Sequence, residues 1–377
     1  MVNTERITQT FCDLVRIDSI GGKERQMADT IRQKLTALGY SSTEDNAGDT
    51  IGGNAGNVIV KIPGNNQAAP LLFMAHMDTV EPGRGKVPII EGDLIKSDGT
   101  TVLGGDDLAG VACILEAINV LKEESISHGD IYAVFTIAEE GGLFGARTLD
   151  ISVIPAKYAY ILDDEGPIGT AAIKAPSYNR LRFIVKGRAA HAGLCPEDGI
   201  NAIRVAAAAI AELPFMGRID AGSTCNIGMI QGGRARNIVP DQVIVDGEVR
   251  SLENEKLSSL TLQLTDSFKK TVEREGGTVD IEVENTYGGY SVAEDHGIIQ
   301  LMKKAASRLD IPVNLHATGG GSDTNVINGK GIPAVDISVG MSNVHSTSEQ
   351  IAISDMVKAA RLMVEIIRVH AEDVSCG

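Results

Sequence analysis

The chain has 377 residues, of which 43% are apolar and 22% charged, the balance of a globular protein long enough for two or three domains. Its 50 acidic residues outnumber its 34 lysines and arginines, and the formal net charge of -16 argues against nucleic acid or an anionic membrane as the main partner. The excess of acid fits either solubility or the clustering of carboxylates around cations, and only the positions of the acids separate the two.

The cysteines favour a reducing compartment. They are odd in number, scattered and without a CxxC pair, so neither a disulfide framework nor a thiolate zinc site is expected: Cys12, Cys113, Cys195, Cys225 and Cys376. The N-terminal segment is amphipathic and lacks the apolar core of a secretory signal, and no apolar run approaches the ~20 residues of a membrane span. We therefore expect a cytoplasmic protein that does not enter membranes.

The first part of the chain alternates helices and strands. Apolar residues at helical spacing predict two opening helices, at 7–15 and 27–38, and an apolar helix at 109–121. Apolar runs predict strands at 55–63, 70–76, 130–138 and 158–164. Uninterrupted apolar strands separated by helices indicate an α/β fold, with a mixed, largely parallel sheet flanked by helices. We assign residues 1–177 to the first part of this catalytic domain.

The pattern changes near Tyr178, where a strand alternates in polarity and so predicts one wet sheet face. The order strand, helix, two strands, helix, strand predicts an inserted ferredoxin-like α+β domain at 178–287. Residues 288–377 return to helix, strand and helix, and we expect them to complete the catalytic domain.

The strand at 70–76 delivers His76 and Asp78, whose period-two spacing points both side chains to one side. A neutral imidazole held by a carboxylate binds a divalent metal well, although a strand-end histidine beside a solvated aspartate has the same sequence. Asp106 and Asp107 stand between two glycines and an apolar helix. One acid there is an ordinary helix cap, and the second is in excess of that need.

Two further apolar strands end in acids. The strand at 130–138 stops at Glu139 and Glu140, where one carboxylate can bind metal while its neighbour abstracts a proton, although a solvated loop pair remains open. The strand at 158–164 ends in acids before Gly166 and Pro167, which turn chemistry also explains. Since parallel strands end at one edge of a sheet, we expect a single crevice that collects these side chains: His76, Asp106, Glu139, Glu140 and Asp164. His345 then completes a set of two histidines and three carboxylate ligands, in which one of the two glutamates is a ligand and the other the base.

Seven motifs in order, AHMDTV, GGDDLAG, AEEGGLFGA, DDEGPIG, GRAAHAG, RARNIVPD and HSTSEQI, resemble the peptidase T group of the aminoacylase, carboxypeptidase and peptidase T zinc family over the whole chain. The resemblance implies two divalent cations, with zinc favoured and cobalt or manganese as alternatives. It implies one cation bound by His76, Asp106 and Asp164, and the other by Asp106, Glu140 and His345. Asp106 is then the bridging carboxylate.

The resemblance also implies roles beyond the ligands. Asp78 corresponds to the family's partner of the metal-binding His76, and Glu139 to its general base. The peptide bond between Asp106 and Asp107 is expected to be cis. In the inserted domain His191 is expected to reach a substrate oxygen, supplied either by a homodimer through this domain or by closure of the domain as a lid about a hinge. Asn237 and Arg236 are expected to be further substrate contacts.

The predicted function is two-metal hydrolysis of peptide bonds in short peptides, as in a tripeptide aminopeptidase. A carboxypeptidase or an N-acyl amino acid deacylase would use the same metals on another part of the substrate. A non-catalytic metal-dependent binding protein is the alternative of a different class. Phosphate and dinucleotide sites are disfavoured because the glycine-rich GxGxxG and GxxxxGK[ST] patterns are absent from the sequence.

Overall fold

A computed structural model describes residues 1–372, which form two compact units. Unit 1 comprises Met1–Ile173, Ser291–Ala317 and the chain from Ser322 onward. Unit 2 comprises Lys174–Tyr290 and Thr318–Gly321, so the segment that the sequence assigns to the insertion, 178–287, lies within unit 2.

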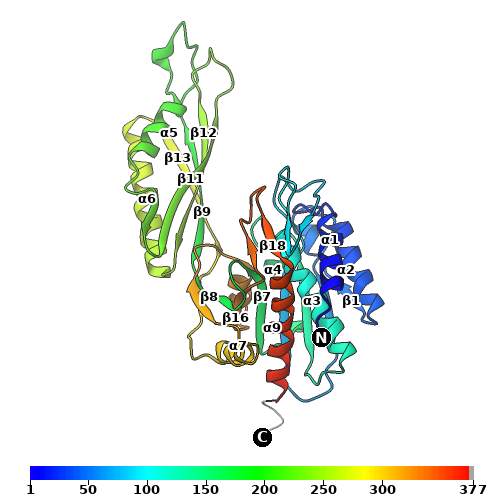
Figure 1. Ribbon diagram of the computed structural model, residues 1–377. Helices are drawn as coiled ribbons and strands as arrows, with labels where there is room; N and C mark the ends of the chain where they lie inside the picture. Colours follow the sequence, from blue (N-terminus) through cyan, green and yellow to red (C-terminus); the bar gives the residue numbers. More distant parts are fainter. Residues whose placement is uncertain (373–377) are drawn as a thin grey trace. The chain divides into compact units, whose positions relative to one another are not determined.

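Unit 1 is built on a mixed sheet whose central strands run parallel. Its strands are β1 (Ser42–Glu44), β2 (Val58–Ile62), β3 (Leu71–His76), β6 (Ile131–Thr136), β7 (Tyr158–Asp164), β8 (Thr170–Ala175), β14 (Tyr290–Ser291), β15 (Asn314–Ala317) and β16 (Ala334–Ser338). Their order is β1-β2-β6-β3-β7-β16-β8-β14, with β15 beside β8 (Figure 1). Strands β6, β3, β7 and β16 are mutually parallel neighbours, whereas β2 runs antiparallel to β6 and β8 antiparallel to β16.

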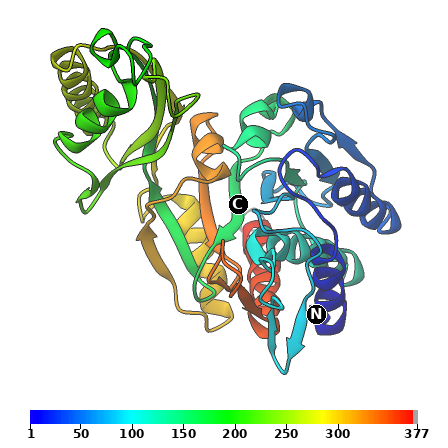
Figure 2. The ribbon, with the colours of Figure 1, turned by 90° about the horizontal axis from the view of Figure 1, so that it is seen from above.

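Helices cover both faces of this sheet (Figures 1 and 2). They are α1 (Thr4–Val15), α2 (Arg25–Ala37), α3 (Gly105–Glu123), α4 (Phe144–Thr148), α7 (Gly297–Arg308), α8 (Asp323–Gly329) and α9 (Ile353–Glu372). Helices α1, α3, α7 and α9 pack together, and α3 lies on β3 and β7. On the other face, Ile327 of α8 shares a hydrophobic core with Leu72, Met74 and Ile161 of the sheet. The predicted α/β fold is confirmed.

Strands β3 and β6 carry no charged side chain before they end. Every position of β3 and β6 is buried, because helices lie above and below both strands. A polar group inside such a strand would lose its contact with water, so chemistry is confined to the edge where the strands stop.

A small antiparallel sheet fixes the loop that carries His345. Its strands are β4 (Ile89–Glu91), β5 (Leu94–Lys96), β17 (Met341–Ser342) and β18 (Gln350–Ala352), in the order β17-β18-β5-β4. His345 lies in the turn between β17 and β18. Pairing of these two strands therefore closes the loop and brings the histidine to a defined position.

Unit 2 is an antiparallel sheet with helices on one face. Its elements are β9 (Ser177–Lys186), α5 (Ala202–Ala211), β10 (Gly217–Asp220), β11 (Ser223–Gly232), β12 (Gln242–Ser251), α6 (Asn254–Arg274) and β13 (Thr278–Tyr287). The strand order is β10-β11-β12-β9-β13, in which the last four have the predicted ferredoxin-like arrangement and β10 is an added edge strand. Phe183 stacks on Phe268 of α6 with ring centroids 4.0 Å apart. Burial alternates along β9, as its polarity predicts.

The described cysteines Cys12, Cys113, Cys195 and Cys225 are free thiols, and Cys376 lies outside the described residues. Within residues 1–372, no helix combines the length and the apolarity needed to span a membrane.

Candidate metal centre

The carboxylate of Asp106 lies between two imidazoles. Its Oδ1 is 2.9 Å from Nε2 of His76, and its Oδ2 is 3.0 Å from Nε2 of His345. Oε1 of Glu140 lies 2.9 Å from the same nitrogen of His345. Four of the residues that the sequence predicts as metal ligands are therefore close together, although they are spread over positions 76 to 345 of the chain.

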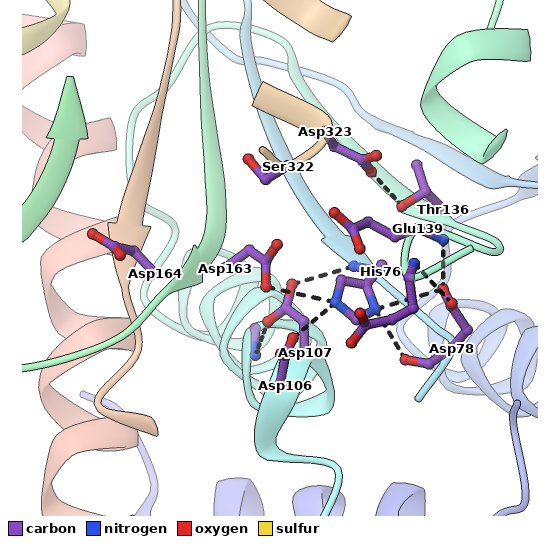
Figure 3. Close-up of polar contacts among 12 residues, drawn as sticks. His76, Asp78, Asp106, Asp107, Thr136, Glu139, Asp163, Asp164, Ser322 and Asp323 are labelled. Atoms are coloured by element: carbon purple, nitrogen blue, oxygen red, sulfur yellow. Dashed lines mark hydrogen bonds and ion pairs between the residues drawn. The ribbon is translucent and has the colours of Figure 1, made fainter. Parts of the chain in front are cut away.

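The remaining predicted ligand, Asp164, lies apart from this cluster, and the neighbouring Asp163 lies beside it instead (Figure 3). Oδ1 of Asp163 is 3.5 Å from Nε2 of His76. Oδ2 of Asp164 is 2.8 Å from Nε2 of His316, a contact outside the cluster. We therefore correct the predicted ligand set by replacing Asp164 with Asp163.

Strand alternation explains this correction. Ile161 of β7 and Met74 of β3 belong to the core beneath α8 and are register partners. Two residues further along each strand, Asp163 and His76 point to the same face as that core. Asp164 has the opposite alternation and points to the other face of the sheet. Only one of the two adjacent acids can reach the cluster.

The ring of His76 is oriented for binding a cation through Nε2. Its Nδ1 is 2.9 Å from the backbone oxygen of Asp78, which can only accept a hydrogen bond. In the neutral ring Nδ1 therefore carries the proton, and Nε2 keeps the lone pair with which it can bind a cation. The side chain of Asp78 is further away, 3.6 Å from Nδ1. The predicted partnership of these two residues thus runs through the backbone oxygen of Asp78 rather than its carboxylate.

The carboxylate of Asp78 holds the turn that follows β6. Its two oxygens accept the backbone N–H groups of Glu139 at 2.9 Å and of Glu140 at 3.2 Å. Glu139 itself is 7% exposed and lies beside the cluster (Figure 3). The same aspartate therefore orients His76 and places both glutamates.

Asp107 has a structural role next to the bridging carboxylate. Its Oδ1 accepts the N–H of Gly110 at 3.0 Å, which caps the first turn of α3, and its Oδ2 accepts the N–H of His76 at 3.2 Å. The peptide bond between Asp106 and Asp107 is cis, as predicted.

Glu349 ties the loop of Asp106 to the loop of His345. Its carboxylate accepts the N–H of Gly104 at 2.8 Å and the N–H of Asp106 at 3.0 Å, and it follows His345 by four residues. The side chain is 1% exposed. Glu349 stands within the HSTSEQI motif, but its role could not be predicted from the sequence, because its partners Gly104 and Asp106 lie more than 200 residues away in the chain.

The charges of the cluster suit cations. Burial raises the pKa of Asp163 and of Glu139 well above the ordinary range. For Asp106 burial acts in the same direction, but hydrogen bonds from His345 and His76 outweigh it and hold the pKa below its usual value. Hydrogen bonds to Asp106 and Glu140 in turn raise the pKa of His345 to about 10. The carboxylates thus draw positive charge onto the imidazoles, and a divalent cation would supply that charge.

The donor set fits divalent cations of the zinc type. Donor atoms of His76, Asp106 and Glu140 lie within 4.8 Å of one another, and so do those of His76, Asp107 and Asp163. Imidazole nitrogen and carboxylate oxygen are the ligands of zinc in catalytic sites, and also bind cobalt or manganese.

The predicted substrate contacts lie together in unit 2. The N–H of Ala192, which follows His191, donates to the backbone oxygen of Asn237 at 3.0 Å. The side chain of His191 is exposed, and its Nδ1 accepts the N–H groups of Gly193 at 3.2 Å and Leu194 at 3.1 Å. Arg236 is exposed and directly precedes Asn237 in the chain.

Comparisons with known proteins agree with the motifs. An aminopeptidase PepT of Bacillus cereus with a crystal structure is 42% identical, covers 98% of this chain and 99% of that one, and gives a TM-score of 0.87. A tripeptidase of Staphylococcus aureus is 36% identical over 99% of this chain and 100% of that one, with a TM-score of 0.92. An uncharacterized protein of Bacillus subtilis is 41% identical over 372 residues, 99% of this chain and 100% of the relative.

These similarities confirm the resemblance to peptidase T. A sequence profile described as peptidase family M20/M25/M40 matches residues 72–369, which include every residue of the cluster. With the fold, the motifs and the profile in agreement, the chain belongs to peptidase family M20/M25/M40.

Proposed function

We propose that the chain is a two-metal peptidase of short peptides in which Glu139 is the general base. The observation that carries the proposal is the position of Asp106, which offers one oxygen toward His76 and the other toward His345. A carboxylate with an imidazole at each oxygen is suited to bridge two cations. Membership in a peptidase family supports a peptide bond as the bond that is cleaved.

Two ligand sets share Asp106 in this proposal. His76 and Asp163 join it on one side, and Glu140 and His345 on the other. We propose zinc as the native cation, since two imidazoles and three carboxylates match its ligand preference. Bound cations supply Lewis acidity, which polarises a peptide carbonyl and makes a water molecule more acidic.

Glu139 moves the proton. It follows a buried strand, is itself buried, and is held through its backbone N–H by Asp78. Its carboxylate takes a proton from the attacking water and then gives it to the leaving amine, so the proton reaches the product without crossing bulk water. The neighbouring Glu140 points to His345 instead and is free to act as a ligand.

His191 donates to the substrate oxygen on which negative charge develops. Because its Nδ1 accepts two backbone N–H groups, the proton of the neutral ring sits on Nε2. An exposed N–H donor of this kind stabilises an oxyanion. We extend the proposal to Asn237 and Arg236 as contacts for the rest of the peptide. A homodimer through unit 2 and a cytoplasmic location remain predictions.

The substrate class follows the named relatives. One solved relative is called an aminopeptidase and another a tripeptidase, and both match nearly the whole chain. We therefore propose that short peptides with a free amino end, tripeptides above all, are the substrates.

The test is turnover by the metal-reconstituted protein on di-, tri- and tetrapeptides, blocked peptides and N-acyl amino acids, with products identified by mass spectrometry. Glu139→Gln should keep both cations, counted by elemental analysis, and lose about 10²–10⁴-fold in kcat. Activity of this variant near that of the unmodified chain would refute the assignment of the base. Cleavage of N-acyl amino acids alone, or from the carboxyl end, would instead indicate a deacylase or a carboxypeptidase. A metal-replete protein inert on every substrate would indicate a binding protein.

A further inference from the structure

The backbone that carries Glu139 is held by side chains from three other segments of unit 1. We call residues 137–140 the base loop. The N–H of residue 137 donates to Oδ1 of Asn57 at 3.1 Å, and that of residue 138 to Oε1 of Glu24 at 3.0 Å. Asp78 accepts the N–H groups of the last two residues. Four consecutive amides are therefore fixed by side chains rather than by neighbouring strands.

Burial of the Glu24 carboxyl group is unfavourable in free energy, and the role of Glu24 in its own helix does not explain it. It is 0% exposed, and its Oε1 also accepts the N–H of Gly22 at 2.8 Å. Within the described residues its Oε2 has no hydrogen-bond partner, which destabilises a buried carboxyl group. Glu24 occupies the N-cap position of α2 but makes no side-chain cap there. Capping of its own helix is therefore not its role.

The residue that Glu24 holds has an unusual backbone conformation. Ala138 has a φ of 46°, in the left-handed region that residues with a Cβ atom rarely adopt. This turn redirects the chain at the end of β6, so the direction of Glu139 depends on it. The hydrogen bond from Ala138 to Glu24 stabilises this conformation at the position where it is needed.

Asn57 fixes the start of the same loop from the other side. It is 0% exposed, and while its Oδ1 accepts from residue 137, its Nδ2 donates to the backbone oxygen of Gly145 at 2.9 Å. One amide group thus joins the strand end to the helix that follows Glu139. The base loop cannot shift without breaking contacts at both of its ends.

We propose that Glu24 is a positioning residue for the general base, and that Asn57 supports it. Neither side chain is placed to touch substrate or cations. They hold the base loop so that the carboxylate of Glu139 keeps the geometry that proton transfer requires. This proposal rests on the assignment of Glu139 as the base.

The test compares two substitutions of nearly equal size in the metal-reconstituted enzyme. Glu24→Met removes the acceptor, and Glu24→Gln keeps an oxygen that can accept the same two N–H groups. We expect Glu24→Met to lower kcat about tenfold or more while KM changes less than about twofold and both cations stay bound. We expect Glu24→Gln to restore kcat to within about threefold of the unmodified enzyme.

Asp130→Leu is the matched control. Asp130 accepts the N–H of Gly64 at 2.8 Å beside the opposite end of β6 and pairs with Lys61 at 2.6 Å. Its loss therefore removes an acceptor of a backbone N–H, together with this ion pair, far from Glu139. We expect its kcat to stay within about twofold of the unmodified enzyme.

Three results would overturn the proposal: an unchanged kcat in Glu24→Met, an equal loss in Glu24→Gln, or a loss of cations that accounts for the fall in activity. If Glu24→Met does not fold, Asn57→Leu decides by the same measurements, and an unchanged kcat there overturns the proposal. An inactive Glu139→Gln together with a fully active Glu24→Met would leave the base in place and remove only the role of Glu24.

Discussion

Carboxylates have different surroundings in the two units of the molecule. Around the candidate metal centre of unit 1, Glu24, Asp78 and Glu349 are buried and accept backbone N–H groups. On the sheet and helices of unit 2, acids lie nearer the surface and pair with basic side chains, as in Arg182–Asp246, Lys186–Asp280 and Arg274–Glu212. The net charge of the chain therefore says little by itself, because burial and partner decide what each acid does.

The two surroundings differ in free energy. A hydrogen bond to a buried charged group contributes about 1.5–3 kcal/mol, whereas an exposed ion pair contributes about 0–1 kcal/mol. A substitution among the buried acids of unit 1 should therefore act on geometry, cation binding and pH dependence. The same substitution on the surface of unit 2 should change little.

The largest difference is expected between two adjacent acids of unit 1. Asp163→Asn should lose one bound cation and lower kcat/KM by on the order of 10²-fold or more, because a ligand is removed from the shared cluster. Asp164→Asn should keep both cations and stay within about tenfold, since Asp164 contacts His316 instead. Elemental analysis and steady-state kinetics on the pair measure this. A larger loss in Asp164→Asn would show that the alternation of β7 has been assigned to the wrong face.

The next effect concerns stability and pH. Burial raises the pKa of Glu24 from 4.5 to about 7, so the folded chain binds a proton here that the unfolded chain has released between these values. Stability from this group is present below about pH 4.5 and lost as pH rises to about 7. Glu24→Gln cannot ionise. The free energy of unfolding of this variant, relative to that of the unmodified chain, should rise by about 2 kcal/mol from pH 5 to pH 8. Urea unfolding at each pH measures this. A constant difference across this range would contradict the assignment.

The location of the acidic cluster could be predicted from the sequence, whereas the choice between Asp163 and Asp164 as the acid that faces the cluster could not. Apolar runs that stop at acids mark the ends of β3, β6 and β7, and parallel strands end together. Strand β7 is covered on both faces, so its apolar run contains no alternation that assigns Asp163 and Asp164 to a face. Strand β9 in unit 2 has one solvent-exposed face, so its alternating polarity predicts which side chains point inward.

The positioning residues Glu24 and Asn57 could not be predicted from the sequence, for another reason. Glu24 and Asn57 hold amides that are 114 and 80 residues away in sequence, respectively. Neither residue stands in a motif, because a side chain that accepts a hydrogen bond from a backbone N–H needs only an acceptor atom within reach of it. The ligands were predictable since imidazoles and paired acids are unusual at strand ends, whereas a single glutamate before a helix is ordinary.

The smallest effect is expected in unit 2, and it sets the scale for the comparison. Arg182 and Asp246 are cross-strand partners of β9 and β12, with 37% and 19% of their side chains exposed. Asp246→Asn should lower the free energy of unfolding by less than about 1 kcal/mol, because water screens the pair. Urea unfolding of Asp246→Asn under the conditions used for Glu24→Gln allows the two variants to be compared directly. A loss well above about 1 kcal/mol would mean that exposure does not separate the two classes of carboxylate in this molecule.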